Sequence, residues 1–134
     1  MKTRRLLLVM LAMAGTFADG VDRVTAADNP CAAETDTSAM LNCLNRRDQE
    51  LDGELERSYS QLVSGLSAGS AGNELQRLES AQKAWKAYRE AQLRFIQGMT
   101  ADAGTMAPLL YLQDKISMTE HRIEQLKDGA HLAQ

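Results

Sequence analysis

The sequence predicts an all-α protein, a small three-helix antiparallel bundle with a disulfide-pinned N-terminal strap. Good helix formers dominate the chain, whereas aromatic residues make up 4% of it and β-branched residues are sparse. Three amphipathic stretches follow one another, each ended by residues that break helices. The two cysteines, Cys31 and Cys43, lie close together near the first stretch. With 134 residues, the chain is long enough for one domain.

Residues 1–27 have the pattern of a signal peptide. A basic start precedes an apolar run at residues 6–14, which is shorter than the roughly 20 residues needed to cross a bilayer. Small side chains favour cleavage near Ala26 or Ala27. No Leu-x-x-Cys motif precedes Cys31, so no membrane anchor is expected after cleavage. We therefore expect the protein to be secreted across the inner membrane and to reside in the periplasm.

The domain that remains after this cleavage, residues 28–134, is acidic. The whole chain has 15 basic and 18 acidic residues, of which residues 1–27 hold four and two. The mature part therefore keeps 11 basic and 16 acidic residues, a net charge of −5. This charge argues against nucleic acid and anionic membranes as partners. It suits a cationic protein partner, although modest acidity also serves solubility alone.

The first helix is expected at about residues 37–67, with Asp36 or Thr37 as its cap. Two cysteines in an exported chain point to a disulfide, and loop-closure entropy predicts a stabilisation of roughly 3 kcal/mol. Such a bond would fold the strap at Cys31 back onto Cys43; two free thiols or an intermolecular bond are the alternatives. The apolar stripe of this helix recurs at spacings of three, four or seven: Met40, Leu44, Leu51, Leu55, Tyr59, Leu62 and Leu66.

The second helix is expected at about residues 74–97, with Asn73 as its cap. One face of it should carry Leu75, Leu78, Ala81, Trp85, Tyr88, Gln92 and either Phe95 or Ile96. The third helix is expected at about residues 108–127, with Pro108 in its first turn and Thr105 as a possible cap. Its stripe consists of Leu109, Leu112, Ile116, Thr119, Ile123 and Leu126. The tail, residues 128–134, is predicted to fray.

No residues are arranged for catalysis. The histidines, His121 and His131, lie off the apolar stripes and are expected to be solvated, and the disulfide takes both cysteines. No His, Cys or Glu spacing fits a metal site, and no glycine loop precedes a lysine to bind phosphate. We therefore predict a protein that is not an enzyme and uses no cofactor and no metal.

The segment at residues 82–89 has two interpretations. Gln82, Trp85 and Arg89 share one helical face, with Tyr88 beside them. Trp85 could be a central core residue while Gln82 and Arg89 make buried hydrogen bonds, or the indole and guanidinium could be an exposed anchor for a partner. We favour the core. A buried Arg89 then needs a carboxylate, for which the first helix offers Asp52 or Glu56.

Three stretches together resemble a known family. They are Asp52-x-x-Leu55-x-x-x-Tyr59-x-x-Leu62, Leu78-x-x-Ala81-Gln82-x-Ala84-Trp85-x-x-Tyr88-Arg89 and Thr119-x-x-Arg122-x-x-x-Leu126. With the cysteine pair ahead of them, they are similar to the N-terminal domain family of LprI-type lysozyme inhibitors, which are exported bacterial helical domains. The resemblance covers nearly all of the mature chain. It implies a set of motif residues that are core or buried polar: Asp52, Leu55, Tyr59, Gln82, Trp85, Tyr88, Arg89, Thr119 and Arg122.

The chain departs from this family pattern at two positions. The family usually has four cysteines, but Leu93 stands at the third position and Gln113 or Asp114 near the fourth. This joint absence implies that Cys31 pairs with Cys43, because both cysteines of a second disulfide are missing together. We expect the loop at residues 98–107 to be more mobile as a result.

The resemblance implies a protein that binds and blocks lysozyme-like muramidases. Lysozymes are commonly cationic, so a domain with a net charge of −5 would be steered toward them. The loop at residues 98–107, with Asp102 and Thr105, is the candidate segment to block the catalytic cleft. The alternative is a general periplasmic or envelope module for protein interaction or structure, with another protein partner.

Overall fold

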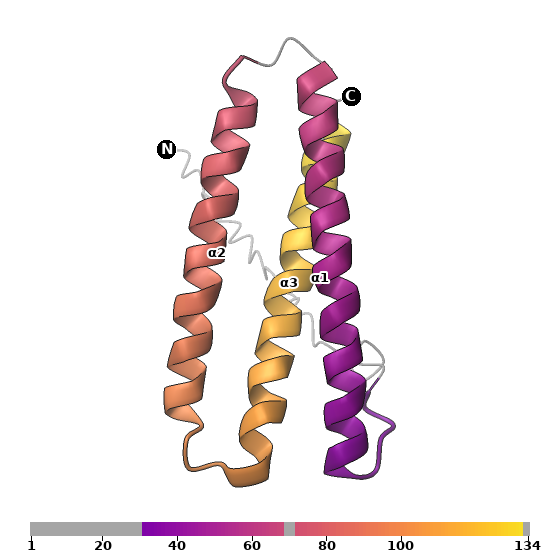
Figure 1. Ribbon diagram of the computed structural model, residues 1–134, viewed down its shortest axis with the longest axis vertical. Coiled ribbons are helices and arrows are strands. Elements are labelled where there is room, and N and C mark those ends of the chain that lie inside the picture. Colours follow the sequence, from indigo (N-terminus) through magenta and orange to yellow (C-terminus); the bar gives the residue numbers. More distant parts are fainter. Residues whose placement is uncertain (1–30, 69–71, 133–134) are drawn as a thin grey trace, which may run out of the picture.

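The computed structural model describes residues 31–68 and 72–132. The predicted signal peptide and its cleavage near Ala26 or Ala27 lie outside the described residues. Three long helices make up the fold, α1 (Thr37–Ala68), α2 (Glu74–Met99) and α3 (Ala107–Leu132), and a short 3₁₀ turn, η2 (Gly104–Met106), precedes α3 (Figure 1). Within the two described ranges there is no β-strand. The prediction of an all-α, three-helix protein is confirmed.

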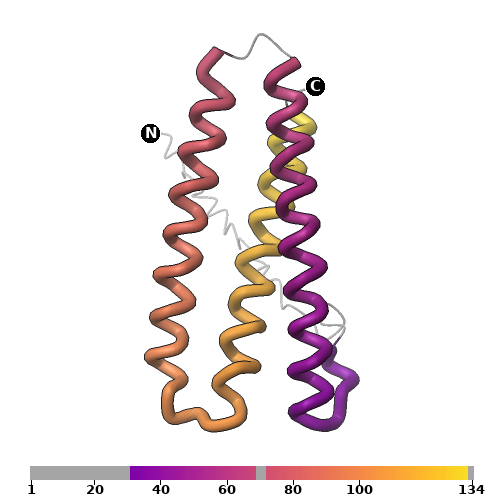
Figure 2. Tube along the Cα trace, in the orientation of Figure 1, coloured from indigo at the N-terminus to yellow at the C-terminus, as the bar shows by residue number. Residues whose placement is uncertain are grey.

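The chain runs up, down and up, so α1 and α3 point the same way and α2 is antiparallel to both (Figure 2). Helices α1 and α3 lie side by side and share the hydrophobic core, whose buried members are Leu44, Leu51, Leu55, Leu62, Leu109, Leu112, Ile116, Ile123 and Leu126. Helix α2 stands to one side of this pair and buries two residues, Gln82 and Leu93. Apolar burial therefore holds α1 to α3 more strongly than it holds α2 to either.

The N-terminal strap is fixed to the start of α1 by a disulfide. Cys31 is completely buried and bonded to Cys43, with 5.7 Å between the two Cα atoms. The backbone N–H of Ala39 donates to Oδ1 of Asp36 at 2.8 Å, so Asp36 caps the helix. The disulfide-pinned strap expected from the sequence is thus present.

Asn73 occupies the cap position of α2, but its side chain makes no capping hydrogen bond. Its backbone already has helical dihedral angles, φ −109° and ψ −9°, whereas a capping side chain works from an extended backbone. The backbone N–H of Asn73 instead donates to Oε2 of Glu74 at 3.2 Å. The expectation that the Asn73 side chain caps this helix was wrong.

The end of α3 also differs from the prediction of a frayed tail. The helix continues to Leu132, because its last turns pack on α1. A Cβ atom on Gly129 would lie 3.1 Å from Cδ2 of Leu62, and Ala130 packs against the core. None of the helices in the described part of the chain is both long and apolar enough to cross a membrane.

Candidate functional site

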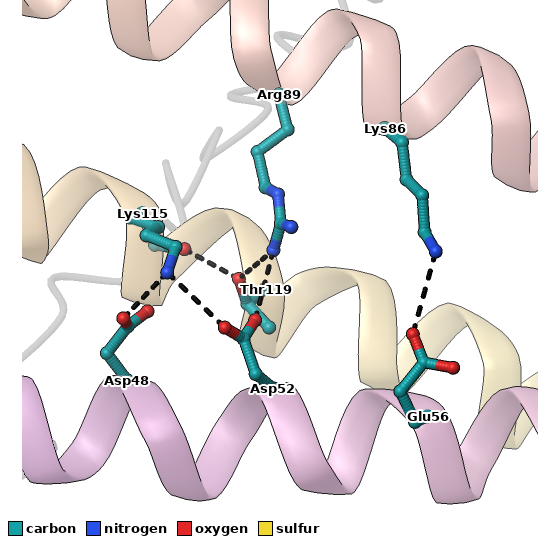
Figure 3. Close-up of polar contacts among 7 residues, drawn as sticks. All are labelled: Asp48, Asp52, Glu56, Lys86, Arg89, Lys115 and Thr119. Atoms are coloured by element: carbon teal, nitrogen blue, oxygen red, sulfur yellow. Dashed lines mark hydrogen bonds and ion pairs between the residues drawn. The ribbon is translucent and has the colours of Figure 1, made fainter.

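Arg89 on α2 reaches across to the other two helices (Figure 3). Its Nη1 donates to Oδ1 of Asp52 on α1 at 3.3 Å and to Oγ1 of Thr119 on α3 at 3.2 Å. Asp52 is one of the two carboxylates expected for this arginine. The other, Glu56, lies 3.6 Å from Nζ of Lys86 instead. A single guanidinium group thus joins all three helices.

Lys115 on α3 completes this polar network from the opposite side (Figure 3). Its Nζ donates to Oδ2 of Asp48 at 2.6 Å and to Oδ2 of Asp52 at 3.4 Å. Burial acts to lower the pKa of Lys115, but the hydrogen bond and charge of Asp48, together with Asp52, outweigh it and raise the pKa above its ordinary value. The hydroxyl of the fully buried Thr119 donates to the Lys115 carbonyl oxygen at 2.8 Å.

Trp85 is half-buried and meets two guanidinium groups. Cζ of Arg89 lies 4.7 Å from the centroid of the indole ring, and Cζ of Arg122 on α3 lies 5.8 Å from it. Nε of Arg122 donates to Oε1 of the buried Gln82 at 2.9 Å. Burial lowers the pKa of Arg122 from its ordinary value. The contact of Arg122 with Trp85 and the hydrogen bond to Gln82 therefore fasten α2 to α3 beside the Asp52 network.

The motif residues divide into an interior set and one exposed residue. The interior set consists of Asp52, Leu55, Tyr59, Gln82, Trp85, Arg89, Thr119 and Arg122, all buried or half-buried. Tyr88 is 59% exposed and lies outside it. Asp48 and Lys115 belong to the network but were missed by sequence reasoning. They lie four residues before Asp52 and Thr119 respectively, so they share a helical face with them, which is the signal that could have found them.

The candidate binding loop is shorter than the expected residues 98–107. Helix α2 extends through Met99, and the 3₁₀ turn η2 occupies part of the remainder. Asp102 and Thr105 are both exposed, Thr105 within η2. The loop lies at the same end of the molecule as the start of α1 and the disulfide-pinned strap (Figure 1).

Four exposed hydrophobic side chains lie at the end of α2, in η2 and at the start of α3, and we call them the loop-end apolar surface: Phe95, Met99, Met106 and Leu110. Their exposed fractions are 59, 70, 50 and 39%. The expectation that Tyr88 would face the core was wrong; of the two alternatives Phe95 and Ile96, Phe95 is exposed and Ile96 is half-buried. Tyr88, Phe95 and Met99 follow at spacings of seven and four, so they form a second apolar stripe on α2. That spacing is the signal by which the surface could have been found.

A groove adjoins the loop-end apolar surface where α2 ends and α3 begins. We call it the loop-end groove, and its lining residues are Ile96, Thr100, Leu110, Gln113, Asp114 and Ser117. Oδ2 of Asp114 is shielded from solvent and has no hydrogen-bond partner among the described residues. The last turn of α2 holds no basic residue, so the negative end of its helix dipole has no basic side chain of its own helix beside it.

The described residues contain no group of three or more His, Cys, Asp or Glu side chains placed to hold a metal ion. His121 and His131 are both exposed. The nearest acceptor or donor groups to His121 are surface residues of its own helix, Glu124 at 4.0 Å and Gln125 at 3.0 Å.

Comparison with protein families gives one match. The model of the family described as lysozyme inhibitor LprI matches residues 28–126. The matched range includes both cysteines, the polar network and the loop-end groove. No curated protein and no solved structure matches the chain significantly. Because the match spans well over half of the sequence, the chain belongs to the LprI lysozyme inhibitor family.

Proposed function

We propose that this protein is an exported inhibitor that binds and blocks lysozyme-like muramidases in the bacterial periplasm. The family match over residues 28–126 carries the proposal. The signal-peptide pattern of residues 1–27 supports export. The Cys31–Cys43 disulfide supports it independently, because disulfides persist in oxidising compartments such as the periplasm.

An inhibitor of this kind needs a rigid support and a surface that fits its target, and the fold supplies both. Helices of 26 residues or more give a rod about 40 Å long. The polar network fixes α2 against the other two helices, and thereby fixes the loop that follows it. A net charge of −5 on residues 28–134 speeds the approach to a cationic lysozyme. The exposed loop with Asp102 and Thr105 then occludes the catalytic cleft.

The test is a titration of the protein against a cationic c-type lysozyme that is lysing bacterial cell walls. We expect lysis to fall with increasing protein, and the inhibition to weaken as salt screens the attraction. The same lysozyme with acetylated lysines serves as a control and should be inhibited less. Absence of inhibition and of a complex at micromolar protein and low salt would contradict the proposal. It would favour the alternative, an envelope interaction module with another protein partner.

A further inference from the structure

We propose that the loop-end apolar surface and the loop-end groove together form the docking site for a cationic protein partner. In this site the carboxylate of Asp114 receives a lysine or arginine of the partner. The inference rests on the proposed function and deepens it, because it names the surface and the chemistry that the partner must offer. The partner is a protein that presents a basic side chain flanked by apolar ones.

The apolar half of the argument is the distribution of exposed hydrophobic side chains. Of the large hydrophobic residues that the described chain exposes, all but Leu132 lie between the middle of α2 and the first turn of α3. Phe95 and Met99 are neighbours of Ile96, which lines the groove, and Leu110 lines it from α3. An apolar surface gathered at one end of a small protein indicates an interaction site.

The electrostatic half of the argument is the half-buried carboxylate of Asp114, which lines the groove. One of its oxygens, Oδ2, is shielded from solvent and has no hydrogen-bond partner among the described residues, and a shielded polar atom without a partner costs free energy. None of the residues that line the groove is basic. Lys115, the nearest cation in sequence, is turned toward Asp48 and Asp52 instead.

Two further features make the electrostatic potential at this end of the molecule negative. Asp102 is exposed in the adjoining loop, and the C-terminal end of α2 has no basic residue in its last turn. Arg94, one turn earlier, is paired with Glu90 at 3.7 Å. A lysine or arginine entering the groove would therefore meet Asp114 and the negative end of a helix dipole, and the exposed Asp102 of the adjoining loop adds to the negative charge at this end.

The experiment compares binding of four proteins to a cationic c-type lysozyme by isothermal titration calorimetry. The protein is produced from the full-length coding sequence and its exported form is purified. Wild type is compared with Phe95→Ala, Asp114→Asn and the control Leu132→Ala. Leu132 is 90% exposed at the opposite end of α3, so its truncation removes a hydrophobic side chain that is more exposed than Phe95 and lies away from the site.

We expect Phe95→Ala and Asp114→Asn each to weaken binding about tenfold, and Leu132→Ala to leave it within about twofold of wild type. The loss in Asp114→Asn should shrink at high salt. The same substitution should raise the melting temperature, because it removes a negative charge whose Oδ2 oxygen is shielded from solvent and has no hydrogen-bond partner among the described residues. A carboxylate with only a structural role would not combine weaker binding with greater thermal stability.

The remaining outcomes separate the two proposals. If wild type inhibits lysozyme and both variants bind as it does, the docking site is wrong while the proposed function stands. If wild type forms no complex, the proposed function is wrong and the docking site loses its partner with it. If wild type self-associates and Phe95→Ala abolishes this, a second copy is the occupant, which also overturns the inference.

Discussion

Replacing Arg89 by Met removes a side chain that joins all three helices while keeping a long apolar stem. The Arg89 side chain is 19% exposed and makes two hydrogen bonds, of 3.3 and 3.2 Å, and a cation–π contact at 4.7 Å. Bonds to charged groups contribute about 1.5–3 kcal/mol each, but these are long and Asp52 is 45% exposed, so solvent screening reduces each to about 1 kcal/mol. With about 0.5 kcal/mol from the cation–π contact, the expected loss of unfolding free energy is about 2–3 kcal/mol.

The loss would be measured by urea unfolding followed by circular dichroism at the helix band. For a domain of this size it corresponds to a fall of roughly 10 °C in the melting temperature. Asp52 keeps its contact with Lys115 at 3.4 Å in this variant, so no carboxylate is left stranded. Adding Asp52→Asn to the variant should therefore cost less than the same change does in wild type. A loss below about 0.5 kcal/mol for Arg89→Met would refute the reasoning, because the contacts of Arg89 would then contribute almost nothing to holding α2 in place.

Three further predictions concern the strap, the Lys115 ion pair and the end of α3. Replacing both Cys31 and Cys43 by Ser should lower the unfolding free energy by roughly 3 kcal/mol in denaturant titrations, and an unchanged value would show that the strap contributes nothing. Because the pKa of Lys115 is raised in the folded state, its contribution is complete below the ordinary lysine value of 10.5 and is lost as the pH rises through the folded-state pKa. Thermal unfolding should thus show an alkaline loss of stability that Lys115→Met diminishes; an identical alkaline profile in the variant would contradict this. Gly129→Val should cost about 1–3 kcal/mol, because its Cβ alone would lie 3.1 Å from Leu62, and a rise in melting temperature would show that the two helices separate easily there.

Periodicity predicted the core of α1 and α3 because their stripes are narrow and almost purely apolar. In α2 it failed for Ala81 and Tyr88, which are exposed, and it could not choose between Phe95 and Ile96, of which only Ile96 is half-buried. The face of α2 that meets the other helices carries Gln82 and Arg89, which are polar, while the apolar stripe through Tyr88, Phe95 and Met99 is exposed. Hydrophobicity alone cannot tell which of two adjacent faces is buried when the buried one is fastened by hydrogen bonds.

The remaining differences depend on contacts between residues far apart in the sequence. Lys115 and Asp48 form their ion pair across 67 residues, and the shielded carboxylate of Asp114 exists only once α2 ends beside α3. The last turns of α3 are ordered by packing on Leu62, whereas local sequence at residues 128–134 indicates a frayed end. The family resemblance identified the polar motif residues, but only the structure shows which of them contact one another.

Helix α2 is attached to α1 and α3 by hydrogen bonds and an ion pair, and this polar attachment has a consequence for how the family can diversify. Helices α1 and α3 supply nearly all of the apolar core. The face of α2 that points away from them therefore does not take part in folding. Substitutions on that face, from Tyr88 to Met99, are free of the packing constraints that limit change in a core. Binding preference can therefore evolve along α2 while the scaffold stays constant. The same attachment implies that α2 opens before the α1–α3 pair, which hydrogen exchange would register as lower protection of its amides.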